Sequence, residues 1–191
     1  MLSEIGRYLP EYLSPENKQR LVEGLKDFPN NFQYYLYDRF MGELLQGDLW
    51  SEFVVIDFDS GQRKSVKGIV LSNSCDVDES NERPVPTKVS FVPLINLNKL
   101  EQLLLSKRSQ QQVENILSEI RNQKMTSFFY LPAGYGVEDE MVALLSDVHS
   151  MPLVRFKEAT SKITTLSQQG FYMFLLKLSI HFCRFQEGVE R

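Results

Sequence analysis

The segment with the most side chains capable of chemistry directly follows an apolar run and consists of Ser72, Asn73, Ser74, Cys75 and Asp76. A loop at the end of a strand is a common place for a reactive cysteine or for side chains that grip a ligand. Cys75 could act as a nucleophile if His149 or His181 served as its base. The same residue types also satisfy backbone groups in turns, and the cysteine could be a small buried hydrophobe. We therefore predict a ligand-binding or structural loop, with a cysteine-dependent enzyme as a further alternative.

Basic side chains precede this segment and could supply charge for phosphate chemistry. Lys64 and Lys67 lie on a predicted strand, with Arg63 beside them. A site that cleaves a phosphodiester needs a base, an acid and preorganised positive charge around one phosphate. Two lysines near a hairpin also commonly form a solvated strand face. Lys64, Lys67 and Cys75 are the catalytic candidates, and the sequence alone does not complete a catalytic set around them.

Acidic side chains at predicted strand ends raise the question of a metal site. Asp57, Asp59, Asp76 and Asp78 could together hold Mg²⁺ or Ca²⁺ if their strands were neighbours. Acids in such positions also form turns and protect sheet edges. Two Cys and two His residues without a zinc spacing argue against a structural zinc site. We expect no metal and no cofactor.

The composition is that of a globular protein, with 42% hydrophobic and 24% charged residues in a chain of 191. A net charge of −4 gives no support to non-specific nucleic-acid binding, which needs clustered Lys and Arg, although a local basic patch would still allow RNA as a partner. No apolar run reaches the roughly 18 residues of a membrane span. The start of the chain lacks the pattern of a signal peptide, and Cys75 and Cys183 match no CxxC spacing. We expect a cytoplasmic protein with reduced thiols and no membrane association.

Hydrophobic periodicity predicts helices at the start and strands after them. Ser14, Pro15 and Glu16 have the residue types of a helix N-terminus. Residues 32–45 are rich in aromatics near helical spacing, so we predict a second helix that either packs on a barrel or serves as an interface. Strands are predicted at residues 49–58, 65–71 and 88–95, the first two as a hairpin and the third after a polar loop over residues 72–86.

The second half of the chain alternates between helical and extended patterns. Residues 97–124 have helical periodicity with a polar interruption at 107–112, which predicts one helix or two. Strands are predicted at residues 128–131 and 141–145, and a further extended segment at 151–156. A final amphipathic helix contains Phe171, Phe174, Leu175, Leu178, Phe182 and Phe185. Short adjacent strands with tight turns favour an antiparallel barrel or curled sheet.

The strands of residues 46–96 resemble the core of the MazF/PemK-type toxins. Chains of that family open with Gly-Asp before the first strand, as Gly47-Asp48 does here. They continue with an apolar strand that ends in Leu-Ser, as at Leu71-Ser72, and with a strand that contains Pro93 in the corresponding place. The resemblance implies a small SH3-like barrel and cleavage of RNA without a metal. It also implies a toxin–antitoxin or phage-defence setting.

The sequence departs from the family at two positions that bear on activity. The family has Arg-Pro just before the strand that ends in Leu-Ser, and this chain has Val66-Lys67-Gly68 there. The family's Thr or Ser after the last strand falls near Asn96. We therefore predict a non-catalytic binding or interaction module with a protein partner, and a metal-independent ribonuclease of toxin type as the alternative. A homo-oligomer is compatible with both.

Taken together, the patterns predict an α+β fold. Its centre is a small SH3-like antiparallel β-barrel or curled sheet with flanking N-terminal, central and C-terminal helices. We expect a single domain over residues 1–191. Within it, residues 1–45 form a helical N-terminal extension, 46–96 the barrel-like core, and 97–191 a helix-strand-helix completion.

Overall fold

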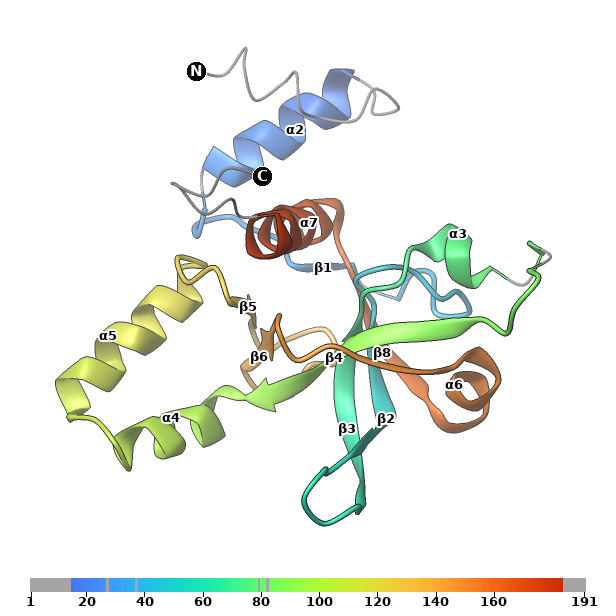
Figure 1. Cartoon of the computed structure of the whole chain (residues 1–191). Helices are drawn as coiled ribbons and strands as arrows, with labels where there is room; N and C mark the ends of the chain where they lie inside the picture. Colours follow the sequence, from blue (N-terminus) through green and yellow to red (C-terminus); the bar gives the residue numbers. More distant parts are fainter. Residues whose placement is uncertain (1–14, 27, 37, 79, 82, 184–191) are drawn as a thin grey trace, which may run out of the picture.

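The computed structural model describes residues 15–26, 28–36, 38–78, 80–81 and 83–183, and its centre is a strongly curled antiparallel sheet (Figure 1). Within this part of the chain, seven of the eight strands follow the order β1-β8-β2-β3-β4-β6-β5, and the eighth, β7, pairs with β4 outside that path. The predicted α+β class with a curled antiparallel sheet is confirmed. The strands are β1 (Tyr35–Leu36), β2 (Leu49–Ile56), β3 (Arg63–Val70), β4 (Lys88–Asn96), β5 (Phe128–Leu131), β6 (Met141–Leu144), β7 (His149–Pro152) and β8 (Ser161–Leu166).

Helices surround the sheet at the N-terminal, central and C-terminal positions that the sequence predicts. Helix α2 packs on α7, while α4 and α5 contact each other beside β4 and β5. The polar interruption near residue 107 separates α4 from α5, so the central helical region is two helices. Among the described helices, none has the length and apolar character that crossing a bilayer requires. The helices are α2 (Pro15–Lys26), α3 (Ser74–Val77), α4 (Leu97–Leu105), α5 (Gln110–Arg121), α6 (Leu153–Ala159) and α7 (Gln168–Phe182).

The helix predicted over residues 32–45 is wrong. This segment contains the short strand β1, which pairs with β8, and it then turns repeatedly. Asp38 and Phe40 have positive φ angles of 50° and 59°, which a right-handed helix does not allow. Tyr34 and Tyr35 are both buried in the main core, so these aromatics pack the segment onto the sheet. The aromatic residues have nearly helical spacing because they pack on the core from an irregular segment, and the segment is not a helix.

Three further elements differ from the predictions. The polar loop over residues 72–86 contains α3, and the extended segment predicted at 151–156 is only half a strand, since α6 begins at Leu153. Strand β8 is not predicted at all, because its first residues, from Ser161, are polar. His149, named above as a possible base for Cys75, is the first residue of β7. Ser14 and Phe185, which the helix predictions include, lie outside the described residues.

A β-bulge in β2 sets the orientation of two aromatic side chains. Trp50 pairs with Gly68 and Phe53 pairs with Val66, so β2 has one residue more than β3 between these pairs. In a regular strand, side chains three residues apart point to opposite faces. The extra residue brings both rings against Phe156 of α6, with ring centroids 4.8 Å and 5.6 Å away. The bulge therefore directs Trp50 toward the site described below.

Lys177 of α7 is buried and joins this helix to the connection between α5 and β5. Its ammonium donates hydrogen bonds to the carbonyl oxygens of Gln123, at 3.0 Å, and of Met125. Burial lowers the pKa of Lys177 from its ordinary value to about 8. The folded chain therefore releases this proton at a lower pH than the unfolded chain does.

We expect the free energy of unfolding to rise by on the order of 1 kcal/mol between about pH 8 and pH 9.5. In this range the unfolded state holds the Lys177 proton and the folded state has lost it, so stability increases with pH. Urea denaturation across this range measures the effect, and Lys177→Met should flatten the curve. Parallel curves for both proteins would contradict the assignment. Above about pH 10 a second group opposes this increase, because burial raises the pKa of Tyr34 to about 12. There the folded state keeps the Tyr34 proton and the unfolded state loses it, so stability falls with pH.

Candidate functional site

A buried ion pair anchors residues 42–45, which form one wall of the candidate site. Lys162 of β8 contacts Asp48, with Nζ 2.7 Å from Oδ2, and the two side chains are 2% and 0% exposed. The Lys162 ammonium also donates to the carbonyl oxygens of Phe40 and Glu43, at 2.6 and 2.8 Å. The Asp48 carboxylate accepts a hydrogen bond from the Leu45 amide at 2.7 Å. This network fixes the backbone of the wall from both ends.

The electrostatic balance of Asp48 depends on its partner. Burial raises the pKa of the Asp48 carboxyl above its ordinary value, and hydrogen bonding to Lys162 and to the Leu45 amide opposes that rise. Without the ammonium, a charged carboxylate at this depth would be very costly. Asp48, which the sequence offers only as part of a family motif, therefore has a structural role here.

Helix α3 forms the opposite wall and is held by the polar residues that precede it. Asn73 caps the helix, since its side chain accepts a hydrogen bond from the Cys75 amide at 3.0 Å. Ser74 Oγ accepts a hydrogen bond from the Gln46 amide at 3.0 Å, which ties α3 to the wall at residues 42–45. Ser72 Oγ accepts from the Ser90 amide at 2.8 Å. These three side chains satisfy backbone groups, as the structural interpretation of the loop predicts.

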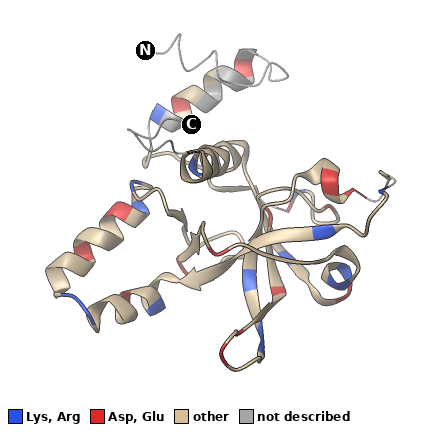
Figure 2. Cartoon of the chain, viewed as in Figure 1, with Lys and Arg blue, Asp and Glu red and all other residues tan. Residues whose placement is uncertain are grey.

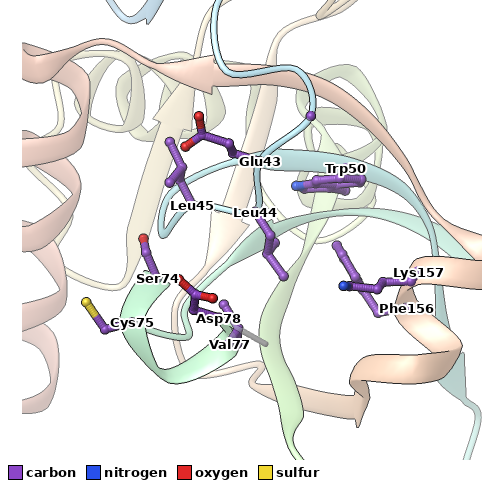
Figure 3. Close-up of a pocket in the computed structure, with 11 residues that line it drawn as sticks. Glu43, Leu44, Leu45, Trp50, Ser74, Cys75, Val77, Asp78, Phe156 and Lys157 are labelled. Carbon is purple, nitrogen blue, oxygen red and sulfur yellow. The ribbon is translucent and has the colours of Figure 1, made fainter. Parts of the chain in front are cut away.

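The floor of the site comes from β2 and α6. The ring of Trp50 packs edge-on against Phe156, and Phe156 also contacts Phe53 in the smaller of the two core clusters. Phe53 in turn stacks on Phe91 with ring centroids 4.0 Å apart. Because these rings support each other, the floor is rigid. Lys157 follows Phe156 and reaches the rim from α6 (Figure 3).

Together these elements line an open cavity of about 540 Å³, which lies within the usual size range of ligand-binding pockets. Leu44 projects from one wall and Val77 from the other, while the Lys157 amine points toward Leu44 (Figure 3). We call this cavity the α3 pocket. It is lined by Gly42, Glu43, Leu44, Leu45, Trp50, Ser74, Cys75, Val77, Asp78, Phe156 and Lys157.

The α3 pocket collects two of the five predicted ligand-binding residues, Ser74 and Cys75. Asp76 instead pairs with Arg83 at 3.1 Å, and Arg83 also donates to the carbonyl oxygen of Cys75. Sequence reasoning did not find Trp50 or Phe156. The available signal for Trp50 was that a lone tryptophan directly follows Gly-Asp-Leu. The position of Phe156 depends on α6, which the sequence pattern does not reveal.

The basic candidates lie apart from the pocket, and acids neutralise them. Lys64 pairs with Asp57 at 2.7 Å and Lys67 pairs with Glu138 at 3.2 Å. The two lysines are three positions apart on β3, so their side chains leave opposite faces of the strand. In Figure 2, basic and acidic positions are both found along the ribbon of the β2–β3 hairpin. Gathering of Arg63, Lys64 and Lys67 into one basic cleft would favour RNA cleavage, and the described contacts of Lys64 and Lys67 do not build such a cleft.

Cys75 is exposed, so the prediction of a buried hydrophobic cysteine is wrong. Within the described residues, neither histidine hydrogen-bonds its thiol. His149 Nε2 contacts Asp147 at 2.9 Å and its ring stacks near Phe91, while the ring of His181 lies against Phe182. In the described part of the chain, His149 and His181 therefore do not pair with Cys75 as the cysteine-dependent enzyme would require.

The acidic residues proposed for a metal site do not converge. Asp57 accepts hydrogen bonds from Ser60 in the hairpin turn, and Asp78 accepts them from Ser80 beside α3. In the part of the chain that the structure describes, no group of three or more His, Cys, Asp or Glu side chains could hold a metal ion. These carboxylates are turn formers.

Two positions where the sequence departs from the toxin pattern have clear structural roles. A Cβ atom at Gly68 would lie 2.6 Å from the ring of Phe53, so glycine leaves room for the stacked rings of the floor. Asn96 caps α4, where its side chain accepts hydrogen bonds from the amides of Asn98 and Lys99 at 2.9 and 3.3 Å. Both residues serve packing and capping.

Comparison with solved structures finds distant likenesses. Neither protein-family models nor curated protein sequences match this chain. Among solved structures, a MazE–MazF complex from Deinococcus radiodurans (form II) is similar at 12% sequence identity, with a TM-score of 0.43. The match covers 74% of this chain and 97% of that chain. The assignment of the fold rests on the strands and helices described above.

Proposed function

We propose that this chain is a non-catalytic binding module that holds part of a protein partner in the α3 pocket. The observation that carries the proposal is the pocket itself, a cavity of about 540 Å³ with an apolar floor and a polar rim. Binding sites commonly combine concave apolar surface with a few polar groups that fix orientation. The pocket adjoins the segment of residues 72–76 that the sequence marks for ligand binding. A toxin–antitoxin or phage-defence setting, implied by the family resemblance, belongs to the same proposal.

The contacts of the catalytic candidates favour binding over catalysis. Lys64 and Lys67 are each paired with a carboxylate, which reduces the positive charge available to a phosphate. Cys75 lines the pocket, and within the described residues neither histidine hydrogen-bonds its thiol. The exposed Cys75 thiol can be labelled chemically, so it can be used to test whether the pocket binds a ligand.

Site-directed disulfide trapping tests the proposal, because Cys75 lines the pocket and Cys183 is exposed outside it. Cys183→Ser protein is incubated with small apolar disulfides under increasing mercaptoethanol, and Cys75→Ser protein is the matched control. We expect the disulfide between a fragment and Cys75 to resist about tenfold more reductant than the disulfide to Cys183. This difference corresponds to about 1.4 kcal/mol of binding free energy between the fragment and the pocket. Trp50 is the only tryptophan of the chain, so its fluorescence should change only when Cys75 is labelled. Equal retention at both cysteines without a fluorescence change would contradict a binding pocket.

An RNA-cleavage assay tests the ribonuclease alternative with the same protein preparations. Wild type, Lys64→Ala, Lys67→Ala and Cys75→Ala are compared in EDTA and then in Mg²⁺, and we expect no cleavage by any of them. Cleavage in EDTA that is lost in the lysine variants would replace the binding module with a metal-independent ribonuclease of toxin type. Cleavage that requires Mg²⁺ would redirect attention to the aspartates.

A further inference from the structure

The α3 pocket has two carboxylates that form no ion pair within the described part of the chain. Glu43 lies on the wall at residues 42–45 and Asp78 follows α3 (Figure 3). Asp78 Oδ1 accepts hydrogen bonds from the amide and hydroxyl of Ser80, both at 2.8 Å, and these bonds lower the pKa of Asp78. Both residues belong to the rim, above the apolar floor. The pocket thus combines excess negative charge with apolar contact surface.

The other charged group of the lining is Lys157, on the α6 side. Its charge contributes to the lowered pKa of Asp78, so it offsets part of the negative charge. The lining then has two carboxylates and one ammonium, and its net charge is −1 (two negative charges less one positive charge). Asp76, which lies nearby on α3, is paired with Arg83 and adds little to this balance. A positively charged occupant would complement the rim.

The apolar part of the lining sets a second requirement. Leu44, Trp50, Val77 and Phe156 surround the depth of the pocket. An apolar side chain placed among them would be removed from water, and the hydrophobic effect would favour its binding. A cation alone would leave this surface unused, and an acidic segment would bring like charges together.

We propose that the α3 pocket recognises a partner segment in which an apolar side chain is followed or preceded closely by a lysine or arginine. The apolar side chain enters between Leu44, Val77 and Trp50, and the basic side chain reaches the carboxylates of Glu43 and Asp78. This inference rests on the proposed binding function and specifies the chemistry of the partner.

Selection from a displayed library of random heptapeptides tests this chemistry. The library is selected on Cys183→Ser protein and counter-selected on the same protein with Cys75 alkylated by N-phenylmaleimide, which blocks the pocket without a core substitution. We expect the pocket-dependent peptides to be enriched in an apolar residue beside Lys or Arg. Pocket-dependent peptides with acidic or uncharged neighbours would overturn the inference and leave the binding function standing. If no peptide depended on the pocket, the binding function would fall, and the inference with it.

The affinity of a selected peptide then assigns the charge contact to particular residues. Glu43→Gln and Asp78→Asn should each weaken binding by about fivefold in Trp50 fluorescence titrations, and Glu119→Gln on α5 should leave it unchanged. Asparagine at position 78 retains an Oδ1 atom that can accept the hydrogen bonds from Ser80. Replacing the peptide's basic residue with glutamine should remove the effect of both substitutions. If Glu43→Gln and Asp78→Asn weakened binding of the glutamine peptide by the same factor, the proposed contact would be overturned.

Discussion

Asp48→Asn is expected to lower the free energy of unfolding by about 3 to 5 kcal/mol. Asparagine can still accept the hydrogen bond of the Leu45 amide, but it leaves the ammonium of Lys162 buried without a counter-charge. Lys162 is 2% exposed, so water cannot replace the carboxylate unless the wall at residues 42–45 moves. Loss of the partner of a buried charge is among the largest effects that a single polar substitution has.

Urea denaturation followed by circular dichroism and by Trp50 fluorescence measures this effect. Asp59→Asn, an exposed acid in the turn between β2 and β3, is the matched control and should change stability by no more than about 0.5 kcal/mol. Asp48→Asn combined with Lys162→Met removes both charges, and we expect it to regain part of the loss. A loss below about 1 kcal/mol in the single variant would show that the pair does not hold the wall.

Gly170→Ala is expected to destabilise the fold by about 3 kcal/mol. A Cβ atom at this position would lie 2.3 Å from the carbonyl oxygen of Tyr34, a backbone atom that cannot turn aside. The same oxygen accepts the amide of Ser167 at 2.8 Å, so the start of α7 is docked directly on the chain that leads into β1. Alanine would push the helix away from this contact.

The sign of this effect separates packing from helix propensity. Alanine favours a helix over glycine by roughly 1 kcal/mol, so propensity alone predicts that Gly170→Ala stabilises the protein. Thermal and urea denaturation of Gly170→Ala decide between the two. Ser179→Ala on the exposed part of the same helix should lie within about 0.5 kcal/mol of wild type. Stabilisation by Gly170→Ala would mean that α7 does not approach Tyr34 as closely as described.

Much of the sheet could be predicted from local sequence, because its strands carry strong local signals. The β2–β3 hairpin and β4 combine β-branched residues with turn residues, and α4 and α5 have clear helical periodicity. The wall at residues 42–45 could not be predicted in the same way. Its conformation depends on Lys162, which is distant in sequence and lies on a strand whose polar start gives no strand signal.

In the candidate site, too, some residues could be predicted from local sequence and others depend on long-range contacts. Ser74 and Cys75 follow an apolar strand, which local pattern can recognise. Trp50 and Phe53 both contact Phe156 because a bulge lies between them, and one extra residue in a strand reverses the face that every later side chain occupies. Phe156 depends on a helix of seven residues, which is too short for periodicity to identify. The pocket is a product of long-range pairing.

The wall at residues 42–45 is held by hydrogen bonds to its main-chain atoms and by the packing of Leu44 on the smaller core cluster. Lys162 contacts the carbonyl oxygens of Phe40 and Glu43, and Asp48 contacts the amide of Leu45. The hydrogen bonds that fix this segment involve none of the side chains of residues 42–45. Substitution of Glu43 is therefore expected to change the charge of the α3 pocket while the wall keeps its path.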